Sequence, residues 1–234
     1  MTRGNEGTER KTHRLEAFND GVLAIAITLP VLDLKLPNVP HGGDLTAAYA
    51  ALAPQYLAYA LSFVVIGLYW AHSHFNGKLV QKTDHGFNLL NLIFLALVSI
   101  TPFPTRPLVE HFSDSANNRA AATIYACLLA APSLAWLMRW IYAVRFDLLD
   151  PRLSPTYLQK LTRSYSGASL ALLGGVALTY LVDFRLGLVV VALITLSYVM
   201  PPLTPEWKRG QEPAHELEEA DENPEIRHQA ASAL

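Results

Sequence analysis

The chain has 234 residues, of which 51% are apolar and only 16% are charged, and its mean hydropathy is positive. A soluble domain of this size carries about a quarter charged residues, so the composition favours an integral membrane protein. The net charge of −2 and the lack of a basic, aromatic-interleaved stretch give no indication of nucleic acid binding. The single cysteine, Cys127, excludes an intramolecular disulfide.

Six apolar segments follow one another along the chain. Each is close to the ~20 residues that a helix needs to cross the hydrocarbon, and none shows the alternating pattern of a barrel strand. The segments cover residues 15–36, 52–75, 87–108, 119–145, 164–182 and 184–203. We therefore predict an all-α polytopic membrane protein with six transmembrane helices, the last two forming a tight hairpin.

The distribution of Lys and Arg predicts the topology. With the N-terminus inside, 14 of the 18 Lys and Arg residues fall on the inner side, so both termini are predicted to be cytoplasmic. Residues 1–13 then form a cytoplasmic segment, residues 14–203 the six-helix domain, and residues 204–234 a disordered acidic tail. Because Asp20 interrupts the first apolar run and the run continues past Ala26, we expect a retained helix rather than a cleaved signal peptide.

Several polar residues fall inside or next to the first three spans. An ionised group such as Asp20 is costly within a membrane and usually has a partner in the protein interior. The predicted topology brings polar groups of three spans to the same depth near the inner face: Arg14, Asn19, Asp20, Trp70, His72, His74, Asn88 and Asn91. Two interpretations stay open, a cluster that only joins the helices and a gating or proton-sensing group.

The sequence lacks the patterns of metal and catalytic sites. His72 and His74 are two residues apart, and side chains at this spacing point about 200° apart on a helix, so they cannot chelate one ion together. No metalloprotease motif, nucleophile elbow, phosphate-binding loop or dinucleotide fingerprint occurs. We expect no enzyme activity, no metal and no cofactor.

The first span carries an apolar stripe at helical spacing. The stripe consists of Val22, Ile25, Leu29, Leu32 and Leu36, with Thr28 beside it. Such a stripe is typical of lipid-facing or packed surfaces and also fits a pore wall. Pro30 removes a backbone donor, which produces either a simple kink or a helix that lines a water-filled path. Ile27 lies off the stripe and is expected to face lipid.

Three motifs resemble one known family. "RLEAFND", from Arg14 to Asp20, is similar to the R-x-x-x-F-S-D signature of the transmembrane protein 175 family, which contains potassium-permeable channels of lysosomes and prokaryotes; Asn19 replaces the usual Ser. "GLYWAHSHF" resembles the end of the family's second span, although Ser73 separates the usual adjacent His pair. "NLLNLIFLALVSITPFPT" is similar to its third span. The close resemblance covers about residues 10–110.

The resemblance implies a pore lined by the first helix of a symmetric homotetramer. Counted from the aspartate of the signature, the pore constriction falls on Ile25, Leu29 and Leu32, with Thr28 as a nearby polar position. The packing network beneath the pore maps onto Arg14, Phe18, Asn19, Asp20, Trp70 and His74; His72 and Asn91 are added because of their predicted depth.

These observations together predict a potassium channel in a prokaryotic cytoplasmic membrane. Its partners would be potassium ions, the lipid bilayer and other copies of the same chain. Three alternatives stay open: a proton-permeable channel, a secondary transporter, and a non-conducting scaffold whose acidic tail binds a partner.

Overall fold

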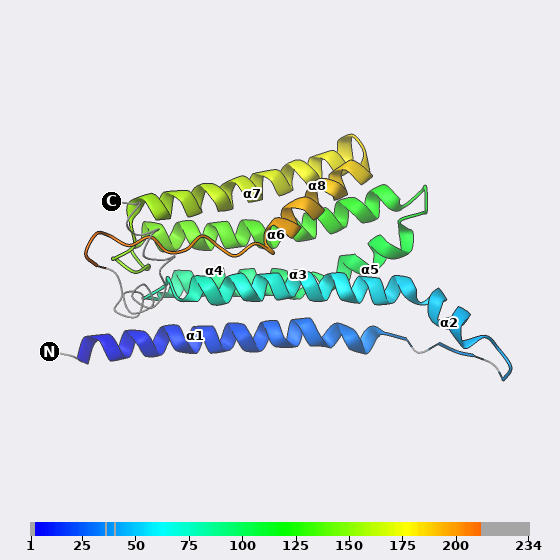
Figure 1. Ribbon diagram of the computed structural model, residues 1–234, viewed down its shortest axis with the longest axis horizontal. Helices are drawn as coiled ribbons and strands as arrows, with labels where there is room; N and C mark the ends of the chain where they lie inside the picture. The colour runs from blue at the N-terminus through cyan, green and yellow to red at the C-terminus, as the bar shows by residue number, and fades with distance from the viewer. Residues whose placement is uncertain (1–2, 36, 40, 212–234) are drawn as a thin grey trace, which may run out of the picture.

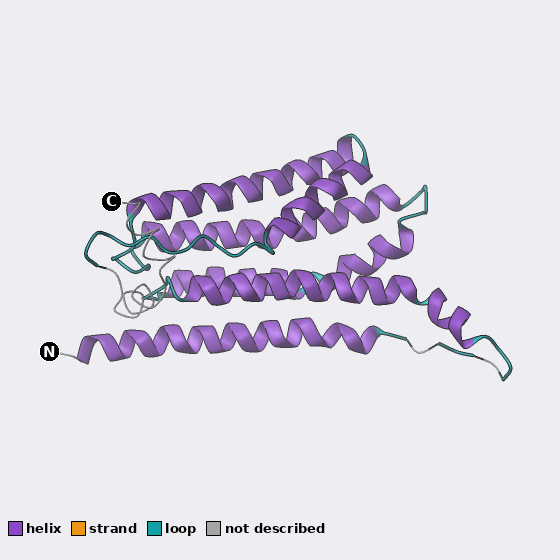
Figure 2. Ribbon diagram, viewed as in Figure 1, coloured by secondary structure: helices purple, strands orange, loops and turns teal. Residues whose placement is uncertain are grey.

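The computed structural model describes residues 3–35, 37–39 and 41–211 of the chain. Within these residues the fold is helical, without a strand of more than an isolated bridge (Figure 2). The elements are α1 (Arg3–Thr28), the 3₁₀ helix η1 (Leu29–Asp33), α2 (Leu45–Ala51), α3 (Ala53–Gly77), α4 (His85–Ser99), α5 (Pro102–His111), α6 (Asn118–Arg145), α7 (Pro155–Leu181) and α8 (Phe184–Ser197).

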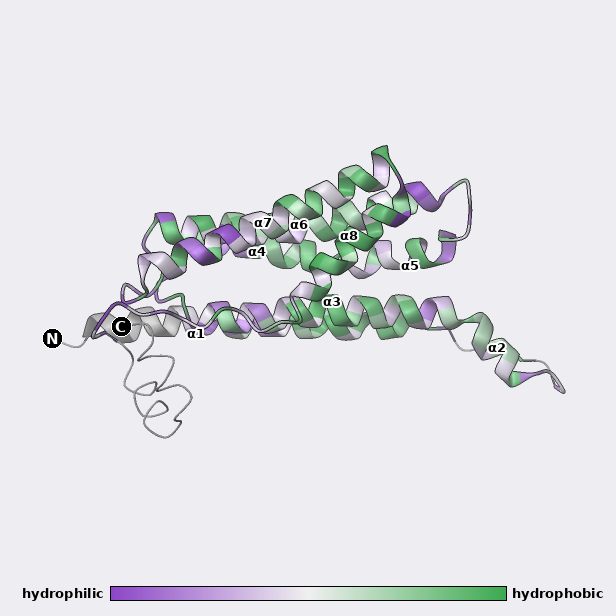
Figure 3. Cartoon of the chain, turned by 45° about the horizontal axis from the view of Figure 1, so that its top comes forward, coloured by the Kyte–Doolittle hydropathy of each residue, from purple (hydrophilic) through white to green (hydrophobic). Residues whose placement is uncertain are grey.

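The long helices form an elongated bundle with α1 at one edge (Figure 1). Helix α1 packs on α3 and α4, whereas α6 contacts α4, α5, α7 and α8. Figure 3 shows apolar residues over much of α3, α7 and α8, with hydrophilic residues gathered toward the loops. Five spans are long and apolar enough to cross a membrane, and α8 is a shorter apolar helix. The predicted all-α, polytopic membrane protein is therefore confirmed.

Proline residues interrupt the third span and shorten the sixth. Helix α4 ends at Ser99 and α5 begins at Pro102, because Pro102 has no N–H with which to continue the helical hydrogen bonds. Helix α8 ends at Ser197 rather than at the predicted residue 203, and Pro201 and Pro202 follow. A residue before proline is disfavoured in the α conformation, so the helix cannot extend through this pair.

The fifth span starts earlier than its apolar run. Helix α7 begins at Pro155, although the apolar run predicts residue 164. The Ser154 side chain accepts a hydrogen bond from the Tyr157 N–H, and Pro155 occupies the first helical position. These helix-start signals lie in a polar stretch, so a search for apolar length alone misses this end of the helix.

Three loop segments join at the end of the bundle where α1 begins, which we call the base: residues 78–84, 146–154 and 204–211. The Gln81 N–H donates to the Leu148 carbonyl at 2.9 Å, and the Ser154 N–H to the Glu206 carbonyl at 2.8 Å. The start of the segment with the predicted disorder is therefore fixed to the loop between α6 and α7. The rest of that segment, residues 212–234, lies outside the described residues, and its disorder stays a prediction.

Helices α7 and α8 form the predicted tight hairpin. Asp183 caps α8, because its side chain accepts hydrogen bonds from the N–H groups of Arg185 and Leu186. The backbones approach closely at Gly187, where an added Cβ would lie 2.5 Å from the Thr179 nitrogen. Small residues at such crossings allow membrane helices to pack backbone against backbone.

Candidate functional site

Helix α1 and the 3₁₀ helix that follows it have a free face between residues 12 and 32. Only 11% of the apolar window of this segment is buried in the chain, compared with 56% for α6. Many residues of this segment are exposed, and one set of them recurs at three- and four-residue spacing and therefore shares one side of the helix. This set is Arg14, Phe18, Gly21, Ile25, Thr28, Leu29 and Leu32.

The three predicted constriction residues all lie on this free face. Ile25 is 57% exposed, Leu29 54% and Leu32 78%, so large apolar side chains stand on the surface of the single chain. Val22 belongs to the same predicted stripe but packs partly against the core. Leu36 lies outside the described residues. The exposure shows that Ile25, Leu29 and Leu32 are available to contact neighbouring molecules, and it does not test their predicted role.

Pro30 changes the helix type rather than producing a sharp kink. The α-helical hydrogen bonding of α1 ends at Thr28, and η1 continues the chain with Pro30 in its first turn. The Thr28 hydroxyl donates to the Ala24 carbonyl at 2.7 Å, so this side chain folds back along its own helix. The apolar positions Leu29 and Leu32 thus lie on a tighter, 3₁₀ segment, in which residues three apart are aligned.

The opposite face of α1 is buried against α3 and α4. Leu23 and Ala26 are among the buried residues, and Asn19 is 9% exposed. Ile27 is partly buried against the core, and its Cδ1 atom lies near Gly67 of α3. The expectation that Ile27 faces lipid is therefore wrong.

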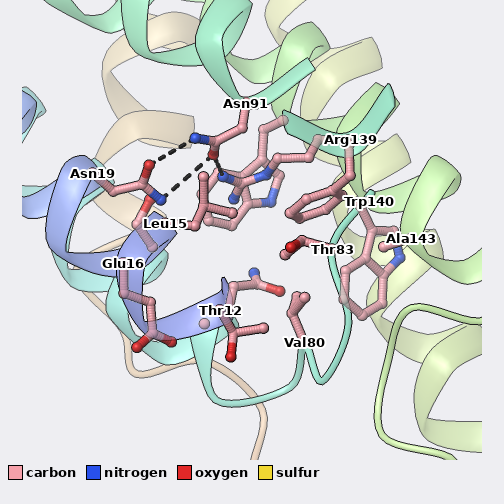
Figure 4. Close-up of a pocket in the computed structure, with 15 residues that line it drawn as sticks. Thr12, Leu15, Glu16, Asn19, Val80, Thr83, Asn91, Arg139, Trp140 and Ala143 are labelled. Carbon is pink, nitrogen blue, oxygen red and sulfur yellow. Dashed lines mark hydrogen bonds between the residues drawn. The ribbon is translucent and has the colours of Figure 1, made fainter. Parts of the chain in front are cut away.

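A polar cluster connects α1, α4 and α6 (Figure 4). The Asn91 amide donates to Asn19 Oδ1 at 2.7 Å, and the Asn19 amide lies 3.5 Å from Asn91 Oδ1. Arg139 of α6 donates to the same Asn91 oxygen at 2.5 Å. Asn19 and Asn91 therefore meet, as the predicted convergence of the first three spans requires.

Sequence reasoning did not single out Arg139. Its side chain is 7% exposed, and its guanidinium carbon lies 4.4 Å from the centre of the Trp136 ring and 4.9 Å from that of Phe94. Cation–π contacts of this kind partly compensate a buried cation. One sequence feature could have indicated a buried arginine: Arg139 lies between Trp136 and Trp140 inside an apolar run.

A second polar contact joins α1 to α3. The Trp70 indole N–H donates to Asp20 Oδ1 at 3.0 Å, and the Trp70 ring stacks on His74 with 6.0 Å between ring centres. Asp20 thus has a hydrogen-bond partner on α3, and both side chains are exposed in the single chain. Arg14 and Phe18 are exposed on the free face of α1, away from both contacts.

His72 does not join this cluster. Its Nε2 atom lies 2.7 Å from the Tyr198 carbonyl oxygen, and its ring meets the Tyr198 ring edge to face. His72 and His74 therefore contact different parts of the protein, as their spacing predicts. Among the described residues, no three His, Cys, Asp or Glu side chains lie close enough together to hold a metal ion.

Comparisons with known proteins identify the family. A protein from Streptomyces collinus, described as a potassium channel, is 40% identical over 140 residues, which cover 59% of this chain and 68% of the relative. A protein of the same description from Chamaesiphon minutus is 36% identical over 160 residues, 67% of this chain and 78% of the relative. The family model of the endosomal/lysosomal potassium channel TMEM175 matches residues 14–102. This chain belongs to the TMEM175 family.

A solved structure of the TMEM175 family has the same fold. The crystal structure of a lysosomal potassium-selective channel TMEM175 homolog from Chamaesiphon minutus superposes with a TM-score of 0.67 at 32% identity, covering 81% of this chain and 97% of that one. The match to an ion channel family means that the chain is not an enzyme. The TMEM175 match includes the free face of α1 and the residues Asn19, Asp20, Trp70 and Asn91, whereas Arg139 lies beyond it.

Proposed function

We propose that the protein is a potassium-permeable channel of a prokaryotic cell membrane, formed by four copies of the chain with α1 innermost. The observation that carries the proposal is the free apolar face of α1, with Ile25, Leu29 and Leu32 exposed in the single chain. The bacterial relatives from Streptomyces collinus and Chamaesiphon minutus, both described as potassium channels, support the permeant ion.

A four-fold arrangement gives the exposed side chains a function. One helix cannot enclose a pore, and closed cyclic symmetry is the usual way to make a ring from identical subunits. Ile25, Leu29 and Leu32 would each form a ring of four apolar side chains. Apolar constrictions gate by dewetting, and the barrier depends on how strongly an ion holds its water. Potassium is hydrated more weakly than sodium, so a modest preference for potassium follows.

The polar contacts of α1 hold the proposed pore helix in place. Asn19 joins α1 to Asn91 of α4, and Asp20 joins it to Trp70 of α3, both near the base. We assign the base to the cytoplasmic side, in agreement with the charge distribution. The chain after α8 returns toward the base (Figure 1), which supports six crossings, with α8 as a short sixth span. The proposed domain is therefore residues 14–203, preceded and followed by cytoplasmic segments.

The reversal potential of the purified protein in liposomes tests the proposal. With potassium on one side and sodium on the other, we expect a current. Its reversal potential should be displaced from zero toward the equilibrium potential of potassium. A current that saturates and requires a proton gradient would instead identify a transporter. Absence of any current from a protein that is correctly inserted would identify a non-conducting scaffold.

Proton permeation is the second candidate. The human relative, which is 41% identical over 139 residues covering 56% of this chain and 28% of its own length, is described as an endosomal/lysosomal proton channel. In this chain His74 stacks on Trp70 beside Asp20, so a titratable group lies next to the contact that holds α1. A reversal potential that follows the pH gradient at equal potassium on both sides would favour this function.

A further inference from the structure

A small cavity with both polar and apolar lining residues lies between α1, α3, α4 and α6 near the base (Figure 4). Its volume is about 40 Å³, which is enough for about two or three water molecules or one small ion. The polar part of the lining combines the buried cation Arg139 with the amides of Asn19, Asn76 and Asn91, the hydroxyl of Ser73 and the carboxylate of Glu16.

Arg139 is incompletely satisfied in this cavity. A guanidinium has five N–H donors. Among the residues that the structure describes, Arg139 donates one hydrogen bond, to the neutral Asn91 amide, and forms no ion pair with a carboxylate. Aromatic faces attract the cation but do not replace the counter-charge that a buried ion needs. The remaining N–H groups and the positive charge therefore call for a negatively charged partner.

Ser73 of α3 provides a second unused donor. Its Oγ atom is buried, and within the described part of the chain it has no hydrogen-bond partner. The neighbouring amides are already engaged, because Asn76 donates to the Tyr165 hydroxyl at 2.9 Å and Asn91 to Asn19. Unused donors around the cavity therefore include those of Arg139 and Ser73, on two different helices.

A second hollow of about 150 Å³ adjoins the cavity. The two share the lining residues Glu16, Asn19 and Ser73, and the second hollow also includes the exposed residue His13. Glu16 lines both hollows, and Asp20 lines the outer one. Their charge repels multivalent anions more strongly than monovalent ones.

We propose that this cavity binds a small monovalent inorganic anion of halide size, chloride in ordinary salt solutions, through the Arg139 guanidinium and the Ser73 hydroxyl. The bound anion neutralises Arg139 and fixes its orientation. Arg139 in turn holds the Asn91 oxygen, and Asn91 holds Asn19 of α1. Occupancy of the site therefore stabilises the position of α1, whichever ion the protein conducts.

Thermal unfolding of the purified full-length protein in detergent tests the site. Potassium concentration and ionic strength are kept constant while chloride replaces gluconate. A ligand that binds the folded state raises the melting temperature by mass action. We expect a chloride-dependent rise that saturates. Arg139→Met removes this rise, whereas Arg145→Met, an exposed position on the same helix, keeps it.

Two further variants keep the Arg139 guanidinium, and the same titration measures their affinity for chloride. Ser73→Ala raises the half-saturating chloride concentration about tenfold or more, as expected for a lost hydrogen bond to a charged group. Glu16→Gln removes a repulsive charge and lowers it about two- to fivefold. If Arg139→Met does not fold, these two variants carry the test. A loss of stability in Glu16→Gln without a change in chloride dependence would make Glu16 the water-bridged counter-charge of Arg139 and overturn the proposal.

Anomalous diffraction from crystals grown in bromide locates the ion directly. We expect a bromide peak within hydrogen-bonding distance of the Arg139 guanidinium. No peak at this position, together with no saturable chloride effect on the wild-type protein, would mean that the cavity holds water alone.

Discussion

Two adjacent polar residues, Asn19 and Asp20, join α1 to two different helices. Neighbouring residues on an α-helix point about 100° apart, so Asn19 can reach Asn91 of α4 while Asp20 reaches Trp70 of α3. This arrangement fixes the rotation of α1 about its own axis. It also determines that Ile25, one and a half turns further along, lies on the free face.

The contact between Asp20 and Trp70 is expected to act on stability more than on ion preference. Asp20→Ala leaves the indole N–H without its acceptor, and we expect a loss of about 1–3 kcal/mol. Trp70→Phe removes the donor, so the double variant should lose less than the sum of the two single losses. Thermal unfolding in detergent measures the stability, and the bi-ionic reversal potential measures the preference. An Asp20→Ala protein of normal stability with altered selectivity would make Asp20 a permeation residue.

Ile25→Asn is expected to weaken ion discrimination. A ring of amides offers partial ligands to a dehydrated cation, sodium included, so the potassium-to-sodium permeability ratio should move toward one. The measurement is the bi-ionic reversal potential of each variant in liposomes. Ile124→Asn is the matched control, because Ile124 is 53% exposed on α6, compared with 57% for Ile25 on α1. A changed ratio in the control and an unchanged ratio in Ile25→Asn would move the pore wall from α1 to another helix.

At the scale of the helices, the sequence predicts existence better than boundaries. Apolar length located the five helices that are long enough to cross a membrane and the shorter apolar helix α8, since a membrane-crossing helix must be apolar along most of its length. It missed the polar first turns of α7, which begin with a Ser154 cap, and the early end of α8 before Pro201. Rotation about the helix axis was also hard to predict. In a membrane both faces of a helix are apolar, so apolar spacing alone did not reveal that Ile27 faces α3.

The hairpin of α7 and α8 allows a sharp test of close packing. In Gly187→Ala the new Cβ would lie 2.4 Å from Thr179 Cγ2 and 2.5 Å from the Thr179 nitrogen, so one helix has to shift. We expect a loss of stability of about 1–3 kcal/mol. Gly174→Ala is the control, because its Cβ would meet nothing within 4 Å. Equal melting temperatures for the two variants in detergent would contradict the close approach.

At the scale of the whole molecule, the proposed tetramer covers the exposed apolar face of α1 with other copies of the chain. We expect the purified protein to have the mass of four chains, measured by light scattering with the detergent contribution subtracted. A monomer or dimer as the only species would contradict the proposed pore. Helical spacing predicted the apolar stripe, and the topology predicted the convergence of the first three spans. The burial of Arg139 and its contact with Asn91 were not predicted. The count of Lys and Arg residues placed Arg139 on the inner side of the membrane rather than in the interior of α6.

The short last helix has a consequence for the surrounding lipid. Helix α8 has 14 residues, so at 1.5 Å per residue it is about 21 Å long, which is shorter than the ~30 Å hydrocarbon core of a typical bilayer. The residues after α8 are attached to the bundle, because the Tyr198 carbonyl oxygen lies 2.7 Å from His72 Nε2 and the Leu203 carbonyl accepts from the Tyr157 hydroxyl. Hydrophobic mismatch of this kind thins the adjacent bilayer at a cost of a fraction of a kcal/mol per ångström. Lipids with shorter acyl chains should therefore gather beside the α7–α8 hairpin, and the protein should partition into the thinner regions of a mixed membrane.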